Sequence, residues 1–257
     1  MSDRTLWEII LTVLQSGALA VVIVNTIRLM LKEKTVFLPF MFVLAMVSFL
    51  LSDLYWIAYD LLKPDTRMPI ACNEIGECAI ILLLSAGLDS LIGDKKKIAG
   101  EIVFAFLFMG ANIALWIAWS GEWFQDILFG IPYVYFLWVL IRGLRYRGCM
   151  TPKELLVASA ACVFVLIMQI PLFVVKGNLF FLSEIIGFGM MFAVMAWLGV
   201  KSVRSKDFFV TASFFLWTEL SMFLTPDFYY DLAMFANTIS FFFMFNSMKK
   251  ELANDIC

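Results

Sequence analysis

The chain has 257 residues, of which 63% are hydrophobic, and a formal net charge of −2. Soluble domains carry roughly 45–50% apolar residues, so this composition excludes a soluble globular protein and predicts an integral membrane protein. The sequence contains no histidine, which argues against haem, the usual zinc sites and histidine-based acid–base catalysis.

Long apolar segments follow one another along the whole chain. A membrane-spanning helix needs about 20 mainly apolar residues, and nine segments fit this length. The predicted fold class is therefore all-α, a polytopic transmembrane helical bundle forming a single membrane domain over residues 1–257. The eighth segment is the shortest, and eight spans are the alternative. The segments cover residues 6–27, 36–60, 69–92, 98–119, 123–142, 154–175, 179–200, 208–224 and 228–248.

The basic residues fall in short clusters between these segments, and alternate sides hold 4 and 15 of them. By the positive-inside rule, the N-terminus is expected outside and the C-terminus in the cytoplasm. We expect a bacterial-type cytoplasmic membrane. Merging the last two segments into one re-entrant unit would place Lys249 and Lys250 on the side poor in basic residues. Nine spans therefore fit better than eight.

Tryptophans lie toward the ends of the segments, where amphipathic rings favour the membrane interface. We interpret them as interfacial anchors rather than as a ligand cage. Those toward the outer side are Trp7, Trp56, Trp116, Trp119, Trp123 and Trp217, and those toward the inner side are Trp138 and Trp197.

Acidic residues concentrate on the expected outer half, which holds 13 carboxylates against 4 basic residues. The outer half is thus formally −9 and the inner half +7. Each helix that runs inward carries an acid near its start, where the helix dipole favours a carboxylate by roughly 0.3–1 kcal/mol. This explanation suffices for Glu8, Asp126 and Asp231.

Three acids are not explained by the dipole. Glu77 lies eight residues beyond Pro69, well inside its segment, whereas Asp53 and Glu219 lie on outward-running helices whose dipole opposes a carboxylate. The segment interiors contain no Lys or Arg away from their ends. An ionisable residue inside a membrane costs at least ~2.5–3.5 kcal/mol and is by default a hypothesis of a functional site.

These acids lead to the hypothesis of a polar cavity that opens to the outer side, walled by the second, third, seventh and eighth segments. An equally weighted alternative is that neutral acids hydrogen-bond across helices and only stabilise the bundle. Gln15, Gln169 and Asn237 are among the neutral polar residues that could partner the acids. The candidate substrate- or ion-binding residues are Glu77, Glu74, Asp53, Glu219, Glu184 and Asn73.

Two classes of function fit these observations. The first is a carrier or channel for a small cationic or protonatable solute, and the second is a membrane sensor or partner subunit that binds a ligand outside. No catalytic motif such as HExxH or GxSxG occurs, so we expect no enzyme, cofactor or metal site. The expected partners are membrane lipid and a small solute or ion, with a homo-oligomer or a cytoplasmic partner protein left open. Loops of at most about a dozen residues leave no surface for nucleic acid.

Overall fold

The computed structural model describes residues 3–32, 36–63, 71–93 and 98–254, which form nine α-helices and no strand. Each helix overlaps one predicted segment, so the all-α prediction is confirmed for these residues. The helices are α1 (Asp3–Met30), α2 (Phe37–Leu62), α3 (Ala71–Ile92), α4 (Ala99–Ser120), α5 (Trp123–Arg147), α6 (Pro152–Val174), α7 (Asn178–Ser205), α8 (Phe208–Leu224) and α9 (Asp227–Asn254).

Seven of the described helices, α1 to α7, are long and apolar enough to cross a membrane. Helix α8 is apolar but has 17 residues, and α9 has 28 residues but interrupts its apolar sequence with Asn237, Ser240 and Ser247. The chain is therefore a multi-pass membrane protein. Nine spans and the orientation of the bundle stay predictions.

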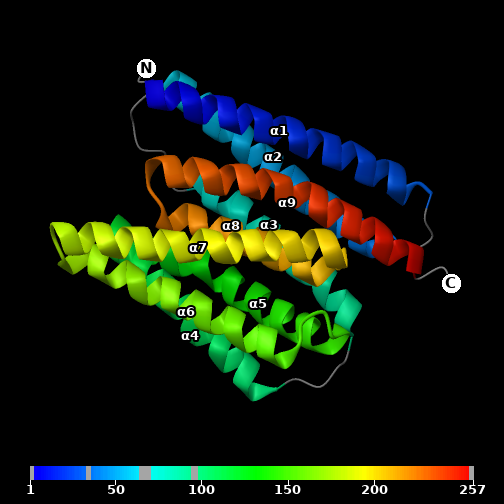
Figure 1. Cartoon of the computed structure of the whole chain (residues 1–257). Helices are drawn as coiled ribbons and strands as arrows, with labels where there is room; N and C mark the ends of the chain where they lie inside the picture. Colours follow the sequence, from blue (N-terminus) through cyan, green and yellow to red (C-terminus); the bar gives the residue numbers. More distant parts are fainter. Residues whose placement is uncertain (1–2, 33–35, 64–70, 94–97, 255–257) are drawn as a thin grey trace.

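The helices run along one common direction, and the two termini lie at opposite ends of the bundle (Figure 1). We call the end where α1 begins the N-terminal end and the end where α9 finishes the C-terminal end. Helix α1 packs on α2 and α9, α3 on α2 and α5, and α4 on α5 and α6, while α7 contacts α6 and α9. These contacts close a ring, and α8 packs on α5, α7 and α9 within it.

Helix α8 lies at the centre of the bundle, where the surrounding helices cover both its apolar residues and its polar residues Thr218 and Glu219. Fourteen of its 17 residues are buried. Asp207 caps its start by accepting hydrogen bonds from the backbone N–H groups of Phe209 and Val210. Gly143 of α5 lies against the Phe209 ring, and a Cβ atom there would come within 2.0 Å of it. The glycine thus permits the close approach of α5 to α8.

The outer surface of the bundle is rich in exposed Leu, Ile, Val and Phe side chains. In water such a surface would drive association, but in a bilayer it faces lipid tails. Trp7, Trp119 and Trp123 are more than half exposed, as expected of interfacial anchors. The anchor interpretation is wrong for Trp116 and Trp217, which are buried in the bundle.

Candidate functional site

Buried polar side chains from four helices meet in the N-terminal half of the bundle. We call this group the acid network. Its members come from α1, α2, α8 and α9, and each is at most 9% exposed. They are Gln15, Ser16, Asp53, Thr218, Glu219 and Asn237.

Asn237 connects three of these helices. Its Nδ2 donates to Oε1 of Glu219 at 2.8 Å and to Oγ1 of Thr218 at 3.1 Å, and its Oδ1 accepts from Nε2 of Gln15 at 3.2 Å. Asn237 is fully buried, so these bonds satisfy an amide that would otherwise be costly to bury. The amide therefore fixes one carboxylate oxygen of Glu219 relative to α1 and α9.

Asp53 forms the second acidic point of the network. Ser16 Oγ donates to its Oδ2 at 3.4 Å, and Asp53 lies close enough to Glu77 and to Glu219 to interact with both electrostatically. Tyr230 of α9 interacts with the same three acids. Within the described residues no Lys or Arg forms an ion pair with Asp53 or Glu219. The network can therefore hold a proton or a cation between its carboxyl groups.

The network lies at an intermediate depth. Glu219 is five residues from the end of α8, Asp53 nine from the end of α2, and Asn237 ten from the start of α9. At 1.5 Å of rise per residue, these positions lie roughly 8–15 Å along their helices from the N-terminal end. They are thus several ångströms inside the bundle but nearer to one end than to the other.

The remaining sequence candidates lie in different surroundings. Glu77 is half-buried on α3 and interacts with Asp53. Glu184 is half-buried on α7 and makes no hydrogen bond or ion pair with another described residue. The side chains of Glu74 and Asn73 lie outside the described residues. Asp53 and Glu219, on the second and eighth helices, thus come together, while Glu184 of the seventh stays apart from the network.

Helices α1 and α9 supply network residues that were not among the sequence candidates. Gln15 and Asn237 were expected only as neutral partners, and Ser16 was not singled out. Their signal is a polar residue in the middle of an apolar segment, but many such residues hydrogen-bond within their own helix. Thr26 and Ser85, for example, donate to carbonyl groups four residues earlier.

The C-terminal end of the bundle contains ion pairs, which we call the charge layer. Arg142 of α5 is 1% exposed, donates to Oδ1 of Asp89 on α3 at 2.8 Å, and stacks on Trp138. Arg145 pairs with Glu101 of α4. The layer consists of Asp89, Glu101, Arg142, Arg145, Arg147, Asp207 and Glu251.

Arg147 joins three helices within this layer. Its guanidinium binds both carboxylate oxygens of Glu251 on α9, at 2.5 and 2.7 Å, and its Nε lies 3.3 Å from Oδ2 of Asp207 at the start of α8. Helix α5 continues beyond residue 142, where the predicted fifth segment ends, to Arg147. In the last turns of α5, Arg142, Arg145 and Arg147 pair with acids on neighbouring helices.

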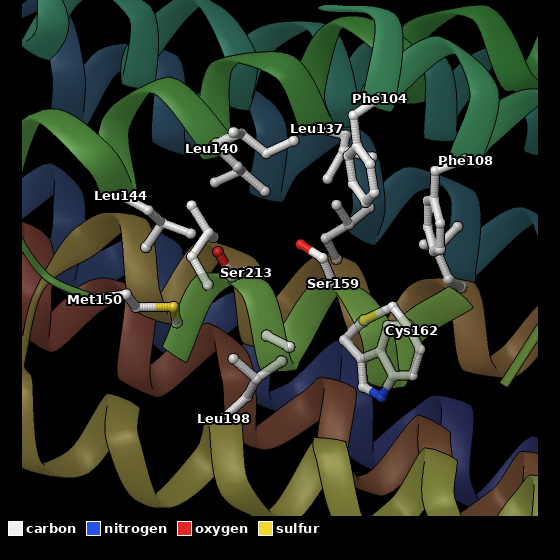
Figure 2. A pocket seen from close by; sticks show the side chains of 16 residues that line it. Phe104, Phe108, Leu137, Leu140, Leu144, Met150, Ser159, Cys162, Leu198 and Ser213 are labelled. Atoms are coloured by element: carbon white, nitrogen blue, oxygen red, sulfur yellow. The ribbon is translucent and has the colours of Figure 1, made fainter. Parts of the chain in front are cut away.

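A cavity of about 90 Å³ lies in the C-terminal half, between α4, α5, α6, α7 and α8. Figure 2 shows Phe104, Leu140 and Leu198 around it, with the hydroxyl groups of Ser159 and Ser213 as isolated polar atoms. The lining is otherwise almost wholly apolar. This cavity therefore offers no continuous polar surface for an ion or a charged solute.

The fold and the site define the class of protein: a multi-pass helical membrane protein with buried acids near one end and ion pairs at the other. Comparison of the chain with family models, with curated proteins and with solved structures finds no match.

Proposed function

We propose that the protein is a carrier for a small cationic or protonatable solute, with nine spans, its N-terminal end outside and its C-terminal end in the cytoplasm. The observation that supports this is the acid network. Asp53 and Glu219 are buried within electrostatic range of one another, and their described hydrogen-bond partners are the neutral side chains of Ser16 and Asn237.

Neutral hydrogen-bond partners of a buried carboxylate are suited to a site that binds and releases a proton or a cation. A carboxylate held by an arginine is already compensated, whereas a buried carboxylate with amide and hydroxyl partners gains from a proton or a cation. Two such groups within electrostatic range repel one another when both are charged, so binding of one cation between them is favoured. Asp53 and Glu219 are the proposed coupling site.

The charge layer favours a carrier over an open channel. A channel needs polar groups along the whole path, but Asp89 and Glu101 of the C-terminal half are in ion pairs with Arg142 and Arg145. A carrier needs access from one side at a time. The described arrangement fits a state in which the cytoplasmic side is closed by the charge layer.

The experiment is proton and monovalent-cation flux into proteoliposomes reconstituted with the full-length protein. Asp53→Asn and Glu219→Gln are expected to abolish flux, because each removes a charge at the proposed coupling site while keeping the side-chain shape. The matched control is Glu184→Gln, which removes the same charge from a half-buried position apart from the network. Flux that persists in both network variants would refute the proposal.

The closed charge layer also favours one alternative, a membrane sensor or partner subunit that binds a ligand at the N-terminal end. Such a protein would not need a polar path to the cytoplasmic side. Ligand binding that depends on Asp53 or Glu219 without any flux in the parent protein would favour this function over transport.

A further inference from the structure

A second pocket opens at the N-terminal end, beside the acid network. It has a volume of about 200 Å³ and is formed by α3, α4, α5 and α8. We call it the aromatic pocket. Its volume lies below the roughly 300–1,000 Å³ of pockets that hold drug-sized ligands, so its ligand must be small. The residues used in the argument below are Glu77, Trp116, Trp119, Asp126, Phe129 and Phe223.

Three aromatic rings from three helices form the inner wall of this pocket. The ring centroids of Trp116 and Phe129 are 5.6 Å apart, those of Trp116 and Phe223 5.2 Å, and those of Phe129 and Phe223 5.1 Å. Trp119 adds a fourth ring and is more than half exposed. The faces of aromatic rings carry partial negative charge and attract cations, most strongly in tryptophan.

Two carboxylates face the same pocket. Asp126 is buried and accepts a hydrogen bond from Ser120 Oγ at 2.5 Å, and Glu77 also lines the pocket. The described lining contains no Lys or Arg. Acid charge beside aromatic faces selects a cation with apolar substituents, because a hard metal ion prefers a shell of oxygen ligands.

Trp116 contributes its ring to this pocket and not its N–H group. The residue is 5% exposed, and its Nε1 is buried out of reach of the pocket space, without a hydrogen-bond acceptor among the described residues.

We propose that the aromatic pocket binds a small alkylammonium ion. The ammonium group lies against the aromatic rings and the carboxylates of Glu77 and Asp126. This inference rests on the proposed function and names its substrate class. Glu77 lines the pocket and interacts with Asp53, so a bound cation changes the field at the coupling site.

Choline is the probe, titrated calorimetrically into the purified full-length protein in detergent. Its uncharged isostere 3,3-dimethylbutan-1-ol tests the need for charge. We expect choline to bind and the uncharged isostere to bind at least about tenfold more weakly. No binding of choline up to about 10 mM, or equal binding of the isostere, would overturn the inference.

The variants separate the parts of the pocket. Glu77→Gln and Asp126→Asn should each weaken choline binding by about tenfold. Trp123→Phe is the control, because Trp123 is exposed and does not line the pocket. Unchanged choline binding in both acid variants would also overturn the inference.

The binding measurement also separates this inference from the proposed function, because it requires no flux. Choline binding without flux in the parent protein would support the ligand site in the aromatic pocket and contradict the proposed carrier function. Flux that requires Glu219, with no choline binding, would support the carrier function and contradict the inference about its substrate.

Discussion

At the N-terminal end, the buried carboxyls of Asp53 and Glu219 have only neutral hydrogen-bond partners among the described residues, whereas at the C-terminal end the buried Arg142 contacts the carboxylate of Asp89. Both ends bury charge in an apolar bundle. In the charge layer, each ion is compensated by another ion of the same chain, so its removal must disturb the fold. In the acid network, no charged side chain of the described residues pairs with Asp53 or Glu219, and the proposed function assigns the compensating charge to a bound proton or cation.

The strongest test of this difference is Asp89→Asn in the charge layer. Arg142 is 1% exposed, so the substitution leaves a buried guanidinium without its carboxylate, at a cost of roughly 3 kcal/mol. For a chain of this size, that corresponds to a fall of about 6–12 °C in Tm, measured by thermal unfolding in detergent. The double variant Asp89→Asn/Arg142→Met should recover most of the loss. An unchanged Tm of the single variant would show that the ion pair of the charge layer does not stabilise the fold.

A smaller loss is expected from Asn237→Leu in the acid network. The substitution removes the amide that bonds Gln15, Thr218 and Glu219 and leaves their polar atoms without that partner, at about 1–3 kcal/mol. Thr238→Val is the matched control on the same helix, because the hydroxyl of Thr238 donates, among the described residues, to the carbonyl of Met234 in its own helix. Equal Tm values for the two variants would show that the network contributes nothing to stability.

Glu219→Gln should change stability least, by less than about 1 kcal/mol, because the new amide oxygen can still accept from Asn237. Flux should nevertheless be lost. Stability and flux should thus separate in the acid network, whereas Asp89→Asn should lower both together. A fall in Tm as large as that of Asp89→Asn would show that the carboxylate itself holds the bundle together.

Seven of the nine described helices could be predicted from the sequence because their apolar segments are long enough to cross a bilayer, and apolar length needs no knowledge of neighbours. The residue at which α5 ends could not be predicted from apolar length. Arg142 and Arg147 look like the start of a loop until Asp89 and Glu251 are placed beside them on α3 and α9. The packing of the helices decides which charges are paired, and hydropathy contains no information on packing.

The packing of the helices also decides which of the predicted site residues come together. Asp53 and Glu219 were identified because they lie deep in their segments against the helix dipole. Asn237 became recognisable as the central partner only once α9 lay between α1 and α8. Glu184 had the same local signal as other acids, but its helix packs chiefly on α6 and α8. Trp116 resembled the exposed Trp119 in the sequence, although its neighbours are the rings of Phe129 and Phe223.

The last test leaves both regions unaltered and uses Cys149, in the turn between α5 and α6. Burial, followed by the negative charge of Asp207 in the charge layer, raises the pKa of this thiol to about 12. A thiol with a raised pKa stays protonated at neutral pH, and only the thiolate reacts. In a chain whose other cysteines are replaced by serine, alkylation should therefore rise about tenfold per pH unit to at least pH 10.

A plateau near pH 9 would mean that neither burial nor Asp207 raises the pKa of Cys149. An impermeant maleimide adds a second readout, because the proposed orientation places Cys149 on the cytoplasmic side. The reagent should modify inside-out vesicles and leave right-side-out vesicles unmodified. Modification of right-side-out vesicles alone would invert the orientation, and the acid network would then open toward the cytoplasm and load its cation from there. The contrast between the two ends would survive that result, since it depends on which charges the chain pairs internally and not on which side they face.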